Sequence, residues 1–388
     1  MKEKFAFYRP AAAAFLTMMA MALTSSSISF FLEPICESLR ISRGSFSLIF
    51  SLMSISGALV NPFLGQIAGK KGVRGILLLA GVWTGGCMFL ISMTSGLWML
   101  YLVAFCMGLF GSTCMALCGN VIVQQAYFGP QASAILGAVM AGSGVGGMIF
   151  SLIIPGCMSG FGWRMAMRIM GSCWLCLLWA AAVLLGKQNM TVGNNASGAV
   201  GLGMTRAEAL KSPKLYLQMV IIIIITACCG VQQQLPSLLS AQGFGTGQVS
   251  VMISVMTAFL AVGKFAQGML YGRIGVKKGG IRMLAVFALG NLAMLSKGLA
   301  YPGLILLAFG MGIYTTLLPQ VARRIFGSRE YAAIWSLIST AGCFGTFVAN
   351  PVWGMIYDKT GTYTLGLAAS ALLLAVAALV LNVSMKEE

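Results

Sequence analysis

One lysine inside a long apolar stretch is the residue of this sequence best placed to do chemistry. Lys264 lies in the run 247–271, about eight residues from its end, or roughly 12 Å along a helix. If the run crosses a membrane, that depth is near the middle of an apolar core of about 30 Å. Such an ammonium can attract a carboxylate and hold it by a charge-assisted hydrogen bond. Small and hydroxyl residues share its helix face: Ser250, Ser254, Thr257, Ala261 and Gly268. The alternative is a structural lysine whose side chain snorkels to the membrane surface.

Neutral polar residues on other apolar runs can complete a binding site around this charge. The candidates besides Lys264 are Ser27, Asn61, Asn120, Gln124, Gln233, Thr257 and Tyr314. The alternative for each is a hydrogen bond between helices. Glu33, near the end of the first apolar run, is the acid that can titrate inside the protein and couple transport to protons; its alternative is a solvated acid at the membrane surface.

The sequence lacks the patterns that enzymes and metal sites need. It has no histidine and only 8 acidic residues, and these are nearly absent from the apolar runs. Its 11 cysteines lie singly or as neighbours, without metal-ligand spacing or a disulfide framework. We therefore expect no catalysis, no cofactor and no metal, and we interpret the cysteines as small apolar residues in helix packing.

Composition and charge predict an all-α membrane protein. The chain is 59% hydrophobic and 9% charged, against roughly 25% charged residues in soluble domains. It contains twelve apolar runs long enough to span a bilayer. They are 10–33, 45–67, 75–94, 97–122, 131–156, 163–186, 215–240, 247–271, 281–299, 301–322, 331–356 and 362–384.

The distribution of basic residues predicts the orientation. With both termini in the cytoplasm, eighteen of the 25 Lys and Arg residues lie on that side, six lie on the other, and Lys264 lies within a run. This is the positive-inside pattern, so the net charge of +17 indicates topology and no nucleic-acid partner. We expect a multi-pass monomer in a bacterial cytoplasmic (inner) membrane, with lipid and a small molecule as its partners.

The chain repeats itself at an offset of 203 residues. The loop residues Gly65, Gly69, Gly72 and Val73 then match Gly268, Gly272, Gly275 and Val276, with basic residues in both copies. The match continues back along the preceding helices, where Asn61 falls on Lys264. We predict two six-helix domains, 1–186 and 215–388, joined by a cytoplasmic linker at 187–214.

Two such repeats and their glycine-basic loops resemble the major facilitator superfamily. Gly69 and Gly272 stand where that superfamily usually has an aspartate. The resemblance implies alternating access, with the substrate site between the two halves near mid-membrane, and it implies that helices one, four, seven and ten line this site.

Several motifs are similar to one branch, the monocarboxylate porters and oxalate/formate antiporters. They are Tyr127-Phe128, the run 141–146 (AGSGVG), Gly162-Trp163-Arg164, Glu208-Ala209-Leu210-Lys211, and Gly354, Asp358, Gly361 and Tyr363 near the last turn. In that branch a helix-eight arginine binds the substrate carboxylate. Lys264 takes the matching place, and it keeps the charge but loses the bidentate geometry. Because one cation neutralises one carboxylate, we favour monoanions over dicarboxylates.

The sequence leaves two kinds of transport open. The favoured hypothesis is a secondary carrier for small organic anions, by anion exchange or proton-coupled symport. The alternative is an exporter of amphipathic drugs or conjugates, in which Lys264 is structural. A sensor without transport activity is the hypothesis from another class.

Overall fold

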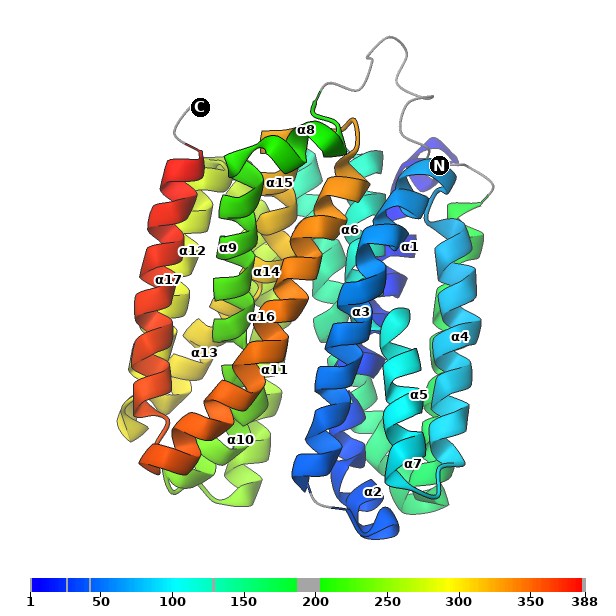
Figure 1. Ribbon diagram of the computed structural model, residues 1–388, viewed down its shortest axis with the longest axis vertical. Helices are drawn as coiled ribbons and strands as arrows, with labels where there is room; N and C mark the ends of the chain where they lie inside the picture. The colour runs from blue at the N-terminus through cyan, green and yellow to red at the C-terminus, as the bar shows by residue number, and fades with distance from the viewer. Residues whose placement is uncertain (1, 26, 42, 128–129, 187–202, 386–388) are drawn as a thin grey trace.

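The computed structural model describes all residues except 1, 26, 42, 128–129, 187–202 and 386–388. The described residues form helices and no strand; their one β-bridge joins Gly203 and Gly327. Figure 1 shows two groups of helices side by side. The first group is α1 (Lys2–Ser25), η1 (Ser27–Phe31), α2 (Leu32–Leu39), α3 (Arg43–Lys71), α4 (Arg74–Ser92), α5 (Leu97–Leu109), α6 (Ser112–Ala126) and α7 (Pro130–Leu185).

The second group follows the described end of the linker. It comprises α8 (Arg206–Lys211), α9 (Pro213–Cys229), α10 (Val231–Ala241), α11 (Thr246–Ile274), α12 (Val276–Ala293), η2 (Lys297–Leu299), α13 (Ala300–Met311), α14 (Ile313–Thr316), α15 (Leu318–Phe326), α16 (Tyr331–Thr360) and α17 (Thr364–Ser384). α1 begins and α17 ends at the same end of the molecule, where the loops α3–α4 and α11–α12 also lie (Figure 1). We call it the basic end, after Lys70, Lys71, Arg74, Arg273, Lys277 and Lys278.

The described helices have the length and the apolar composition of membrane-spanning helices. Ten stretches of them are long and apolar enough to cross a membrane, and the two other predicted spans correspond to α1 and α12. Charged residues lie at the start of both, four in the first nine residues of the chain and three basic residues among the 18 of α12. Large apolar side chains such as Leu102, Val183 and Leu372 are at least 65% exposed, which is stable where the surroundings are lipid. The prediction of an all-α membrane fold is confirmed.

Several predicted spans are interrupted. The fourth is α5 and α6, the seventh is α9 and α10, and the tenth is α13, α14 and α15. The fifth and sixth spans are the two arms of α7, which leaves helical geometry at Gly162 (φ 77°, ψ 164°). A positive φ favours glycine because a Cβ atom would clash there.

The internal repeat of the sequence reappears in the structure. α3 and α11 both have 29 residues, and adding 203 to the bounds of α3 gives the bounds of α11. Asn61 and Lys264 therefore stand at the same depth, ten residues before the end of each helix, or about 15 Å.

Between Lys264 and the basic end, the two groups of helices touch through small residues. A Cβ atom on Gly268 of α11 would lie 2.5 Å from the Ser133 carbonyl oxygen and 2.7 Å from Cα of Gly137, both on α7. A Cβ atom on Gly65 of α3 would likewise collide with Ser336 of α16. At these points the backbones approach so closely that only glycine fits.

Gly268→Ala should lower the melting temperature of the detergent-purified protein. The new methyl group meets backbone atoms of α7, and overpacking of this kind costs about 1–3 kcal/mol. Gly86→Ala is the matched control, because nothing lies within 4 Å of a Cβ atom built at Gly86 of α4. Equal melting temperatures for the two variants would contradict the close α7–α11 contact.

Candidate functional site

Lys264 joins the two groups of helices. Its side chain is only 7% exposed, and Nζ donates a hydrogen bond of 2.7 Å to Oγ of Ser143 on α7. That hydroxyl in turn donates to the carbonyl oxygen of Met140, at 3.0 Å. The ammonium therefore points across the interface between the groups, which the snorkelling alternative does not explain.

The surroundings of the lysine are closely packed. A Cβ atom on Gly144 would lie 2.5 Å from Cβ of Ala261, one turn before Lys264. A Cβ atom on Gly312 would lie 3.0 Å from Cγ of Lys264. Gly312 is where α13 gives way to α14, so the interruption of the tenth span leaves room for the lysine stem.

A series of contacts runs from Lys264 through two thiols and a phenol to Asn61 of α3. Cys229, the last residue of α9, interacts electrostatically with Lys264. Tyr314 of α14 interacts in the same way with Cys229 and with Cys343 of α16. Nδ2 of Asn61 on α3 contacts Sγ of Cys343 at 3.8 Å. We call Asn61, Ser143, Cys229, Lys264, Tyr314 and Cys343 the central cluster.

The central cluster has one basic side chain, Lys264. Six helices contribute to it, α3 and α7 from the first group and α9, α11, α14 and α16 from the second. Its side chains offer an ammonium, an amide, two hydroxyls and two thiols, and no described carboxylate forms an ion pair with Lys264. It can therefore offer a positive charge and neutral hydrogen-bonding groups to one small negative ligand.

A chain of hydrogen bonds lies between the central cluster and the basic end. Gln267 of α11 donates to the Phe309 carbonyl and accepts from the Thr316 hydroxyl. Gln320 of α15 donates to the Thr316 carbonyl (2.7 Å) and accepts from the Ser133 hydroxyl of α7 (2.5 Å). The bond from Ser133 to Gln320, with the glycine contacts, joins the two groups between Lys264 and the basic end.

The described end of the linker is attached to the second group. The Met204 N–H donates to the Phe326 carbonyl (2.8 Å), and the Arg206 N–H donates to Glu330 (2.7 Å). Thr205 caps α8, and its backbone N–H, bonded to the Glu208 carboxylate, lowers the pKa of that exposed group.

Two other predicted site residues are buried on α6. Asn120 donates to the carbonyl oxygen of Ala116 (2.8 Å), while its Oδ1 has no partner among the described residues. Nε2 of Gln124 has none either. Buried polar atoms without partners are costly, so both amides are able to bind a polar ligand. No described contact links them with the central cluster.

The remaining predicted residues are not brought to Lys264. Ser27 donates to the Ala22 carbonyl (3.2 Å), and Thr257 donates to the Ile253 carbonyl (2.9 Å), so each bonds within its own segment. Gln233 is exposed on α10. The side chain of Glu33 lies outside the part of the chain that the structure describes.

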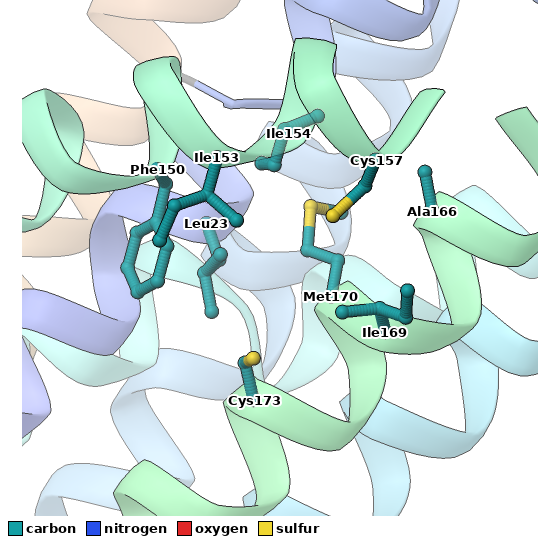
Figure 2. A pocket seen from close by; sticks show the side chains of 9 residues that line it. All are labelled: Leu23, Phe150, Ile153, Ile154, Cys157, Ala166, Ile169, Met170 and Cys173. Carbon is teal, nitrogen blue, oxygen red and sulfur yellow. The ribbon is translucent and has the colours of Figure 1, made fainter. Parts of the chain in front are cut away.

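A small cavity lies elsewhere, between α1 and the two arms of α7 (Figure 2). Its volume is about 40 Å³, and every side chain that lines it is apolar or sulfur-containing. The lining residues are Leu23, Phe150, Ile153, Ile154, Cys157, Ala166, Ile169, Met170 and Cys173. This cavity offers no group to an anion.

Comparisons with solved structures agree with this architecture. The human organic anion transporter MFSD10 (TETRAN) is 15% identical, with 98% of this chain and 100% of that one covered at a TM-score of 0.68. FucP in its outward conformation is 14% identical, with 98% and 99% covered at 0.76. The proton:xylose symporter XylE, bound to 6-bromo-6-deoxy-D-glucose, is 11% identical, with 96% and 94% covered at 0.78. At these identities the likeness shows the fold alone.

The sequence comparisons assign the family. A search among curated protein sequences gives no match. The family description "Major Facilitator Superfamily" matches residues 13–350, which is most of the chain and includes every residue of the central cluster. The chain therefore belongs to the Major Facilitator Superfamily of membrane transporters.

Proposed function

We propose that this transporter carries small organic monoanions, with monocarboxylates as the main class. The observation that supports this most strongly is the buried Lys264, which lies between the two groups of helices and has no described carboxylate partner. A small anion that enters here meets one positive charge and several neutral hydrogen-bonding groups.

The electrostatics favour a single negative charge on the substrate. A charge buried in a medium of low dielectric constant costs several kcal/mol unless an opposite charge pairs with it. One carboxylate neutralises the Lys264 ammonium, whereas a dicarboxylate leaves a second charge unpaired. The neutral groups of Asn61 and Tyr314 then orient the rest of the molecule.

We propose that residues 1–186 and 215–388 rock about this site as two bodies joined by 187–214. By the positive-inside rule, the basic end faces the cytoplasm of a bacterial inner membrane. The hydrogen bonds of Ser133 and Gln320 lie on that side, so this conformation is closed toward the cytoplasm. A monomer suffices, because one chain supplies all the groups of the central cluster.

The organic anion transporter MFSD10 shares the fold, which is in keeping with an anionic substrate. FucP and XylE also share it, and XylE is a proton:xylose symporter. A sugar is neutral, however, and gives no reason for a buried ammonium at the centre. The charge of Lys264 therefore favours the anion.

An exporter of amphipathic drugs is the second candidate, and the apolar cavity of Figure 2 is the observation in its favour. Pockets that hold drug-sized molecules measure about 300–1,000 Å³. The cavity measures about 40 Å³, which is too small for such a substrate.

Monocarboxylates should raise the melting temperature of the purified protein through Lys264. The panel is formate, acetate, lactate and benzoate, each beside its uncharged amide, and a ligand at about 100 times its Kd adds about 2.7 kcal/mol. Lys264→Gln should abolish the shift because the charge is lost. Lys297→Gln, far along the chain at an exposed position, should keep it. Shifts with the amides as large as those with the acids would sink the anion hypothesis.

Transport in proteoliposomes separates the two candidate functions. The parent protein should exchange a labelled monocarboxylate of this panel across a sealed membrane, and Lys264→Gln should reduce the rate at least about tenfold, which corresponds to the loss of about 1.4 kcal/mol. The drug-export hypothesis predicts instead that efflux of an amphipathic cation dye survives in Lys264→Gln. Binding without counterflow would identify a sensor.

A further inference from the structure

The charge of Lys264 has no fixed counter-charge on the elements packed around it. The titratable side chain that interacts with it is Cys229 of α9, and beyond that thiol lie Tyr314 of α14 and Cys343 of α16. Their thiol and phenol groups hold their protons far more tightly than a carboxyl group does. None of them supplies the negative charge that a permanent ammonium needs.

The other helices that neighbour Lys264 add no described negative charge beside it. α7 contains no acidic residue, and its two arginines follow the turn at Gly162. α10 has no ionisable side chain, and α13 has only Tyr301, which is 50% exposed. The charged residues of α12 lie in its first two turns at the basic end, as does Arg273 in the last turn of α11.

The hydrogen-bond partner of Lys264 suits either protonation state. The Ser143 hydroxyl accepts from the ammonium in this structure. A neutral amine keeps two N–H hydrogens and can donate the same bond, while the Ser143 hydroxyl keeps its own bond to the Met140 carbonyl. A carboxylate at the same place would fix the positive charge, whereas serine leaves the charge free to change.

We propose that Lys264 is the proton carrier as well as the anion site. In the empty site the amine can lose its proton, and the deprotonated form takes up one proton when one anion binds, so that a neutral site becomes a neutral ion pair. One proton and one monoanion then cross together, without net movement of charge. This inference rests on the proposed function and decides its coupling in favour of symport.

Lysine is essential to this mechanism, because arginine stays protonated under all conditions in proteins. Lys264→Arg should therefore still bind an anion but should no longer take up a proton with it. This variant separates the two roles of the residue, since it keeps the charge and loses the titration.

Calorimetry in buffers of different ionisation enthalpy counts the protons bound with each monocarboxylate of the panel. Between about pH 6 and about pH 9, uptake by the parent protein should rise toward one proton per anion, because more of the empty sites are deprotonated at high pH. On the alkaline side the apparent affinity should fall about tenfold per pH unit. Lys264→Arg should bind without proton uptake and with an affinity independent of pH.

Three results would overturn parts of this account, and they are distinct. If the parent protein binds an anion without proton uptake throughout this range, the proton-carrier inference is wrong while the anion site stands. Equal uptake by Lys264→Arg would place the proton on another group. If no acid of the panel binds, the proposed function itself fails. Where Lys264→Arg binds no anion, the pH dependence of the parent's affinity decides alone, since a flat profile excludes the inference.

Discussion

A single buried ammonium in contact with both halves of the molecule dominates the physics of this protein. Moving a charge from water into an apolar interior costs several kcal/mol, and the hydrogen bond from Lys264 to Ser143 offsets only part of that cost. Two glycines make room for Lys264 at the interface between the halves. Gly144 lets α7 approach Ala261, and Gly312 interrupts a membrane span beside the lysine stem. The two halves meet at Lys264, so in the proposed mechanism this one group links binding with movement.

Much of the fold was predictable because lipid imposes strong rules on sequence. Each span must be a long apolar run, and the twelve predicted runs correspond to described helices. The offset of 203 residues found in the amino-acid sequence also separates the bounds of α3 from those of α11. The breaks within spans were not predictable, since Gly230 and Gly312 are two among 49 glycines. Whether such a glycine interrupts a helix depends on packing against neighbours.

The depth of Lys264 in its span was predictable from the sequence, whereas most of the residues that contact it were not. Asn61 and Lys264 lie at the same depth in spans two and eight, and Asn61 and Tyr314 both interact with Cys343. That these residues bind a substrate stays a prediction. The sequence predicts Cys229 and Cys343 only as packing residues, because a thiol in an apolar run does not indicate which neighbouring helix it contacts. Ser143 lies in the AGSGVG run that resembles the carrier family, and its hydroxyl there was the available signal. Contacts between helices far apart in the chain depend on tertiary packing that periodicity does not encode.

The chemistry of the site follows from what surrounds the lysine. Hydroxyl, amide, thiol and phenol groups bind without fixing a charge, so the charge state of Lys264 is left to the ligand. In the proposed mechanism, the group that recognises the substrate is also the group that must be neutralised before the site changes sides.

The most direct test of the account is an experimental structure of the protein with 4-bromobenzoate, whose bromine can be located by anomalous scattering. The account predicts the carboxylate at about 3 Å from Nζ of Lys264, in place of or beside the Ser143 hydroxyl. Bromine density confined to the apolar cavity between α1 and α7, with the Lys264–Ser143 bond unchanged, would contradict it.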